Sequence, residues 1–195
     1  MKTKMICAVL ATLTMSLWCA ETTDTTVFSD DFRDKAVFEK NWDFRSPTQP
    51  QEGVLFLAKN HYAPVLKTSI AGKDRITVET EIAVMDKKGF GGLNIDGILF
   101  FLRDGNAVAV FKSPLKNYND SRLKKVPGYE GGKFYKIEIT RTRSGDDYEY
   151  LYKVGGQEIC TVKGQKIPVN NTIRTAKSQT DVKFRNFRLI EHKAK

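Results

Sequence analysis

Alternation of apolar and polar residues with a period of two runs through this chain from residue 27 onward. It constrains the fold more than any other feature. Residues 75–85 show it best: Ile76, Val78, Thr80, Ile82 and Val84 share one side, and Thr77, Glu79, Glu81 and Ala83 share the other. Successive side chains of a β-strand point to opposite faces, so the pattern predicts a long strand with one buried face.

Short segments of similar character recur along the chain. They cover residues 27–32, 54–58, 64–68, 75–85, 97–103, 107–112, 134–143, 148–154, 157–162 and 181–190. Turn residues separate several of them, at 104–106, 144–146 and Gly155-Gly156, which predicts hairpins there. Residues 34–41 predict one short helix near the N-terminus with Asp34 as its cap. Many short strands and almost no helix predict an all-β sandwich or barrel.

Two stretches lack a clear period, residues 112–132 and 163–179. We expect both to be irregular. The first holds two prolines and three glycines and would form a loop of about 20 residues, a length that is uncommon in compact domains and often functional.

The first twenty residues differ from the rest and match a secretory signal. Lys2 and Lys4 give a basic start, residues 6–17 are nearly all apolar or small, and Ala20 suits peptidase cleavage. A lipid anchor at Cys19 fits less well, because Trp18 precedes it. We therefore expect a secreted or periplasmic protein with no transmembrane segment. The expected division is a signal at 1–20, a flexible linker at 21–26, the sandwich at 27–191 and a basic tail at 192–195.

Composition narrows the chemistry further. Loss of the signal leaves Cys160 as the last cysteine, so the domain has no internal disulfide and needs a core of its own. Two histidines and one cysteine do not make a zinc pattern. The formal net charge of +9 favours an acidic polysaccharide or serves solubility alone. A nucleic-acid partner is not expected, since the sequence has no basic helix or finger spacing.

Several motifs in order resemble one superfamily. They are "VFSDDF", "NWDF", "GVLFL", "RITVETEIAV", "GGLNIDGILFFL", "YKIEITRTRSGDDYEYLYKVGGQEI" and "DVKFRNFRLI". Across residues 27–190 they resemble the concanavalin-A-like lectins and glucanases, including laminin-G-like modules and the 3-keto-disaccharide hydrolase domains. The resemblance implies a two-sheet antiparallel jelly roll and a role with sugars, but it does not select an activity.

Candidate catalytic acids follow from spacing and resemblance together. Glu79 and Glu81, two apart on one strand, would lie about 6.6–6.8 Å apart, a separation that a glycosidase can use. The family 16 glucanases resembled here carry Glu-x-Asp-x-(x)-Glu. Glu79 matches the first acid and Glu81 stands at the Asp position, but Ala83 and Val84 occupy the last one. If the chain is an enzyme, its candidate acids are Glu79, Glu81 and Asp96; otherwise the pair lies on a solvated strand face.

Candidate ligand-binding residues mix aromatic rings with polar groups, as carbohydrate recognition requires. They are Tyr118, Asn119, Arg122 and Tyr129 in the first irregular stretch, and Tyr148 and Tyr150 on a later strand. The tyrosine row, which includes Tyr152, can equally be core packing. Trp42, His61 and Tyr62 form a further patch in which Trp42 suits the core better.

The resemblance also implies a structural calcium in some relatives, for which Asp30, Asp31 and Asp181 are the candidate ligands; no other cofactor is expected. Three hypotheses for function remain. The leading one is an exported lectin-like domain that binds carbohydrate without cleaving it. The others are a glycoside hydrolase of the 3-keto-disaccharide hydrolase or a related type, and a structural or adhesion module with a protein partner.

Overall fold

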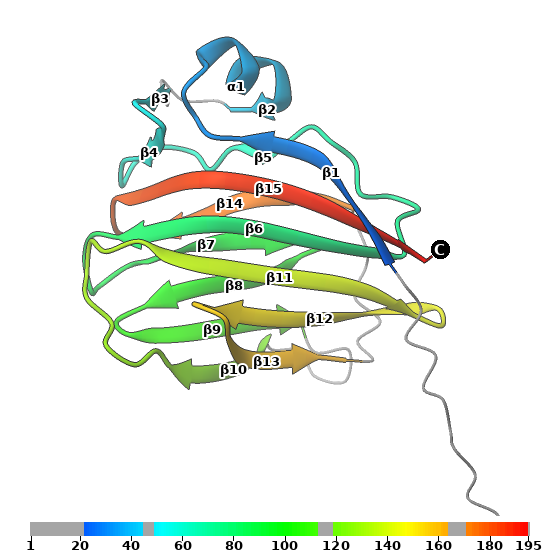
Figure 1. The fold of residues 1–195 in the computed structure, drawn as a ribbon. Helices are drawn as coiled ribbons and strands as arrows, with labels where there is room; N and C mark the ends of the chain where they lie inside the picture. The colour runs from blue at the N-terminus through cyan, green and yellow to red at the C-terminus, as the bar shows by residue number, and fades with distance from the viewer. Residues whose placement is uncertain (1–21, 45–48, 113–118, 164–170, 195) are drawn as a thin grey trace, which may run out of the picture.

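The computed structural model describes residues 22–44, 49–112, 119–163 and 171–194. Within them the chain forms two antiparallel sheets stacked on one another, with one helix at an end of the stack (Figure 1). Sheet A holds β1 (Thr22–Asp30), β3 (Pro50–Gln51), β4 (Val54–Leu57), β6 (Arg75–Val84), β11 (Tyr135–Ser144), β12 (Asp147–Val154), β13 (Gln157–Val162) and β15 (Val182–Ala194). Sheet B holds β2 (Trp42–Asp43), β5 (Val65–Leu66), β7 (Phe90–Ile95), β8 (Ile98–Arg103), β9 (Asn106–Lys112), β10 (Asn119–Lys125) and β14 (Ile173–Ser178).

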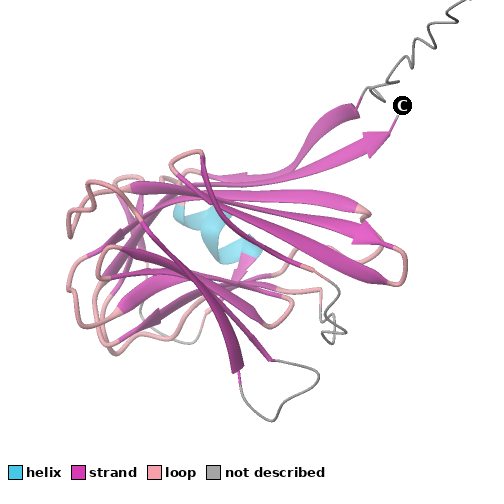
Figure 2. Cartoon of the chain, turned by 90° about the horizontal axis from the view of Figure 1, so that it is seen from below, coloured by secondary structure: helices cyan, strands magenta, loops and turns pink. Residues whose placement is uncertain are grey.

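The strand order confirms the predicted sandwich. Sheet A runs β13-β12-β11-β6-β15-β4-β3, with β1 added alongside β15, and sheet B runs β10-β9-β8-β7-β14-β5-β2. Seen along the layers, the two sheets face each other, and the C-terminal strand projects beyond them with a partner strand (Figure 2). Pairing between strands distant in sequence, β6 with β15 in sheet A and β7 with β14 in sheet B, places the C-terminal strands within both layers.

The core lies between the sheets and uses the predicted apolar face of β6. Ile76, Val78 and Ile82 are fully buried there. The predicted turns are confirmed as well: at the β8–β9 turn Asp104 and Gly105 both have positive φ, 44° and 75°, as a tight hairpin requires.

The single helix of the described residues, α1 (Lys35–Asn41), also forms where the sequence predicts it. The Asp34 carboxylate accepts from the backbone N–H groups of Ala36 at 2.8 Å and Val37 at 3.2 Å, which satisfies two donors at the helix start. Phe38 is buried and stacks near Trp42 at a ring separation of 6.1 Å. This anchors the helix over one end of the core. No helix in the described ranges has the length and apolar character needed to cross a membrane.

Four segments differ from the sequence-based expectation. Residues 22–26, expected as a linker, begin β1, and residues 192–194, expected as a tail, end β15. The irregular stretches at 112–132 and 163–179 contain β10 and β14. The physical reason is shared: pairing with a neighbouring strand orders polar segments whose own propensity is weak. The expected signal at 1–20 lies outside the described residues.

Candidate functional site

Each sheet has an inner side that meets the core and an outer side that does not. Because side chains alternate along a strand, the buried residues of each strand identify the outer ones. The outer face of sheet A carries Glu79, Glu81 and Lys136, while that of sheet B carries Asp43 and Arg174. The two outer faces differ in their chemistry.

Glu79 and Glu81 lie on one face, as their spacing predicts. Both line a hollow of about 250 Å³ together with Lys136, Asn186 and Arg188. The Glu79 carboxylate accepts from Lys136 Nζ at 3.2 Å, and its other oxygen lies 3.6 Å from Arg188 Nη1. Glu79 is therefore held between two cations of its own chain.

Glu81 is held in the same way. Its carboxylate accepts from Arg185 Nε at 2.7 Å and from Asn186 Nδ2 at 2.8 Å. A bulge in β15 between Arg185 and Arg188, where Asn186 has a φ of 54°, places that amide over Glu81. Burial alone would raise the pKa of Glu81, but the hydrogen bonds from Asn186 and Arg185 outweigh it and the pKa is lowered. A carboxylate in this state is a poor general acid near neutral pH.

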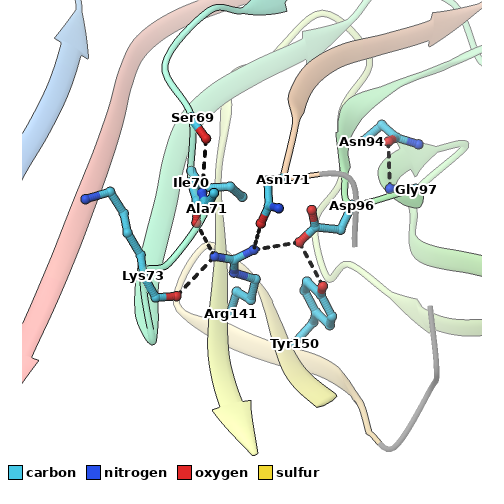
Figure 3. Close-up of polar contacts among 10 residues, drawn as sticks. All are labelled: Ser69, Ile70, Ala71, Lys73, Asn94, Asp96, Gly97, Arg141, Tyr150 and Asn171. Carbon is cyan, nitrogen blue, oxygen red and sulfur yellow. Dashed lines mark hydrogen bonds and ion pairs between the residues drawn. The ribbon is translucent and has the colours of Figure 1, made fainter. Parts of the chain in front are cut away.

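Asp96 does not join the two glutamates, which corrects the expected set of acids. It belongs to the turn of sheet B between β7 and β8 and is fully buried (Figure 3). One oxygen, Oδ2, lies 3.0 Å from Arg141 Nη1 and accepts from the Tyr150 hydroxyl at 2.9 Å. Arg141 also donates to the carbonyls of Ile70 and Lys73, at 2.6 Å and 3.1 Å. Asp96 is thus part of an ion pair that joins the two sheets.

The tyrosine row of β12 is core rather than a sugar platform, so the expectation for Tyr150 is wrong. Tyr150 and Tyr152 are at most 1% exposed, because their strand positions face the other sheet. Burial and the neighbouring Asp96 raise the pKa of Tyr150, so its hydroxyl stays protonated and donates. Tyr148 is half-buried, with the Arg141 guanidinium 4.2 Å above its ring centre.

The remaining candidates from the first irregular stretch are not brought together in the described structure. Arg122 is exposed on β10, 5.9 Å from the centre of the Phe111 ring. Tyr129 stacks on Tyr135 with ring centres 5.1 Å apart. Tyr118 lies outside the described residues, as does the side chain of Asn119.

The expected calcium ligands do not converge. Asp30 is buried and accepts from the Phe32 backbone at 2.8 Å and from Trp42 Nε1 at 2.9 Å. Asp181 accepts from the Lys59 backbone at 2.7 Å, and Asp31 is exposed beside Arg33. In the described part of the chain, no three His, Cys, Asp or Glu side chains cluster in a way that could hold a metal. Instead, each of the three aspartates accepts a hydrogen bond from a backbone N–H group of the protein.

Another hollow, of about 490 Å³, lies between α1 and β15. Its polar groups are already engaged: Asp34 caps the helix, Asp31 accepts from the Arg33 backbone at 3.1 Å, and Arg188 faces Glu79. Size alone therefore does not identify a ligand site here.

A different kind of hollow, of about 260 Å³, opens on the outer face of sheet B. We call it the Tyr62 pocket; its lining residues are Asp43, Phe44, Tyr62, Ala63, Val65 and Arg174. The Tyr62 side chain is 68% exposed, which is unusual for a large ring. Among the described residues, the side chains of Asp43, Tyr62 and Arg174 form no hydrogen bond or ion pair with one another or with the rest of the protein.

Strand pairing assembles this pocket from distant segments. Val65 pairs with Asp43 on one side and with Arg174 on the other, and Arg174 pairs in turn with Asn94. The inner-facing neighbours fix the orientation: Trp42 is buried next to Asp43, and Ile173 and Thr175 are buried around Arg174. Burial of these neighbours forces the two charged side chains outward.

The sequence pointed to Tyr62 only as part of a patch with Trp42 and His61, and it missed Asp43 and Arg174. The available signal was the alternation of a buried ring with an outward acid at Trp42 and Asp43. Arg174 lies in a segment with little apolar contrast and gave no comparable signal.

Comparisons with known proteins address the fold. No protein-family model matches the sequence, and no curated protein sequence matches it. Among solved structures, a Bacillus subtilis protein of unknown function with a galectin-like fold has a TM-score of 0.60 at 11% identity, covering 90% of this chain and 100% of that one. An endo-1,3-beta-glucanase from Streptomyces sioyaensis has a TM-score of 0.60 at 10% identity, covering 86% and 96%. The Emp46p carbohydrate recognition domain in its potassium-bound form has a TM-score of 0.59 at 14% identity, covering 80% and 91%.

The fold is a concanavalin-A-like jelly roll. At these identities the likeness establishes architecture and not activity. The jelly roll implied by the sequence motifs is confirmed.

Proposed function

We propose that this chain binds carbohydrate in the Tyr62 pocket and does not cleave it. One observation carries the proposal: an exposed tyrosine ring stands beside a guanidinium and a carboxylate that have no partner within the described protein. A tyrosine ring can stack on the apolar face of a sugar, while Arg174 can donate to its hydroxyl oxygens and Asp43 can accept from its hydroxyl groups.

The size of the pocket supports a single sugar unit. Its volume of about 260 Å³ lies below the roughly 300–1,000 Å³ of sites for drug-sized ligands. Two of the solved structures of this fold are named for carbohydrates, the recognition domain of Emp46p and the Streptomyces glucanase. These names make a sugar the first ligand class to test.

The distribution of carboxylates supports binding without cleavage. Glycoside hydrolysis uses two carboxyl groups on opposite sides of the bond, one of them protonated. Asp43 is the one carboxylate among the described lining residues of the Tyr62 pocket. Glu79 and Glu81 lie on the outer face of the other sheet and are paired with cations. The signal expected at residues 1–20 supports a location outside the cytoplasm, where a polysaccharide is available.

A glycan array of neutral and acidic sugars, probed with the chain from residue 21 onward, tests the proposal. We expect binding to at least one glycan class and a loss of up to about tenfold in Tyr62→Ala, the size expected for one stacking contact. Phe56→Ala is the control, because Phe56 is 37% exposed but lies on the outer face of sheet A.

Two results would overturn the proposal. One is the absence of binding above background for every glycan. The other is an equal loss of binding in Tyr62→Ala and Phe56→Ala.

A further inference from the structure

On sheet B, three apolar residues of the described chain are buried without belonging to the core between the sheets. Phe101, Val108 and Ala176 are only 7–8% exposed, yet they lie apart from the inter-sheet core cluster. Phe101 pairs with Val108, and Ala176 pairs with Gly92, which pairs with Phe101, so all three share the outer face of sheet B. They form the floor of an apolar strip on the face that holds the Tyr62 pocket.

Half-buried residues widen this strip. Leu99 and Val110 pair with each other in the next cross-strand row, and Phe90 packs against Phe101 with ring centres 4.7 Å apart and the rings tilted by 42°. Leu123, at the far edge on β10, is 65% exposed. Contiguous apolar patches on a protein surface often mark binding sites.

The strip runs directly from the Tyr62 pocket. One row of paired residues crosses sheet B from Arg174 through Asn94 and Leu99 to Val110. Neighbouring strands are about 4.8 Å apart, so Val110 lies about 14 Å from Arg174 along this row. The first half of the row is polar and the second half is apolar. A ligand that extends from the pocket over the sheet therefore moves from polar to apolar surface.

We propose that the ligand is amphipathic: a sugar unit in the Tyr62 pocket that carries an apolar substituent lying on the Leu99–Val110 strip. This rests on the proposed function. A second sugar placed over the strip would lose water from its hydroxyls without gaining hydrogen bonds, which is unfavourable. An acyl, alkyl or aryl group in the same place would bury apolar surface on both sides, which is favourable.

The test compares glycosides that share one sugar and differ in chain length. Methyl, butyl and octyl β-glucosides, β-galactosides and α-mannosides are titrated by NMR below the concentrations at which the octyl compounds form micelles. We expect affinity for at least one sugar to rise with chain length, by up to about fourfold for each buried methylene. The octyl compound should therefore bind at least about tenfold more tightly than the methyl compound.

Variants locate the chain on the strip. Leu99→Gln and Val110→Thr change half-buried outer-face residues and should bring the octyl-to-methyl affinity ratio close to one, leaving methyl glycoside affinity unchanged. Leu151→Gln is the matched control, because Leu151 is a half-buried aliphatic residue on the outer face of sheet A. It should leave both affinities unchanged. Sedimentation at the same concentrations reports whether a second copy of the chain covers the strip instead.

The outcomes separate the two proposals. If methyl glycosides bind and longer chains add nothing, the amphipathic ligand is wrong and the sugar site stands. If no glycoside of any length binds, the sugar site is wrong as well. A chain-length gain that persists in Leu99→Gln and Val110→Thr, or that accompanies self-association, overturns the placement of the substituent on this strip.

Discussion

The two outer faces of this sandwich are built from the same kind of strand but treat their polar groups differently. On sheet A the glutamates are internally paired: Glu79, Glu81, Glu138 and Glu149 each lie within 4 Å of a lysine or arginine nitrogen. On sheet B the outward groups of the Tyr62 pocket form no such pairs within the described chain. The glutamates named on sheet A are paired within the protein, whereas the polar side chains of the Tyr62 pocket are not.

The difference shows why a pair of carboxylates on a strand is weak evidence for catalysis. Glu79 and Glu81 share a face and a hollow, as their spacing predicts, yet each is neutralised by its neighbours. A hydrogen bond or ion pair within the protein contributes to its stability, and a group without such a partner does not. We therefore expect substitutions on sheet A to change stability and those in the Tyr62 pocket to change affinity.

The largest predicted effect is on stability and comes from the buried ion pair between Arg141 and Asp96, which joins the two sheets. Arg141→Met leaves the buried Asp96 without its cation, so we expect the free energy of unfolding to fall by about 3–5 kcal/mol. Urea denaturation followed by fluorescence measures this. Arg143→Met is the control and should change stability by less than about 0.5 kcal/mol, because the Arg143 side chain is 56% exposed. An equal effect of the two variants would show that Arg141 does not join the sheets.

The second-largest predicted effect is a loss of glycan affinity. Arg174→Glu places a second acid beside Asp43 in the Tyr62 pocket. We expect affinity for the best glycan of the array to fall more than about tenfold, since a hydrogen bond to a charged group contributes about 1.5–3 kcal/mol. The midpoint of thermal unfolding should stay close to that of the unchanged protein. Full binding by Arg174→Glu would place the sugar elsewhere.

The same charge reversal on sheet A should lower stability rather than glycan affinity. Arg188→Glu brings a like charge toward Glu79, whose carboxylate now lies 3.6 Å from the guanidinium. We expect a loss of stability of up to about 1 kcal/mol, because surface ion pairs of this kind are weak. Glycan affinity should not change. A loss of glycan affinity in Arg188→Glu would mean that the outer face of sheet A also contributes to binding, and would contradict the proposed difference between the two faces.

The smallest predicted effect depends on pH. The lowered pKa of Glu81 means that its contribution to stability is complete above the unfolded-state value of about 4.5 and is lost as pH falls through the folded-state value. We therefore expect the stability advantage of the unchanged protein over Glu81→Gln to shrink as the pH falls below 4.5. Urea midpoints at several pH values measure it. An advantage that grows on acidification would mean that the carboxylate is not stabilised by Arg185 and Asn186.

The sequence predicted what local patterns encode. The alternation in residues 75–85 identifies β6 and its buried face, and Asp34 identifies the start of α1. These features depend on side-chain periodicity and capping, which residues close in sequence determine. The jelly roll was implied by the resemblance of the motifs to a known superfamily.

The site depended on contacts that local patterns do not encode. Asp43 and Val65 lie in two-residue strands, and Arg174 meets them only through the pairing of β14 with β5. Asp96 shows the converse: it was a candidate catalytic acid by sequence, but it is buried and paired with Arg141 from the other sheet. Long-range pairing decides both cases.

Mapping the bound sugar onto the two faces tests the central claim most directly. Backbone amide and side-chain NMR shifts are recorded as the best glycan of the array is added to the chain from residue 21 onward. We predict that the largest changes occur at Tyr62, Arg174 and Asn94 on the outer face of sheet B, with none at Glu79, Glu81 or Asn186. Changes centred on Glu79 and Glu81 with sheet B unaffected would contradict the account.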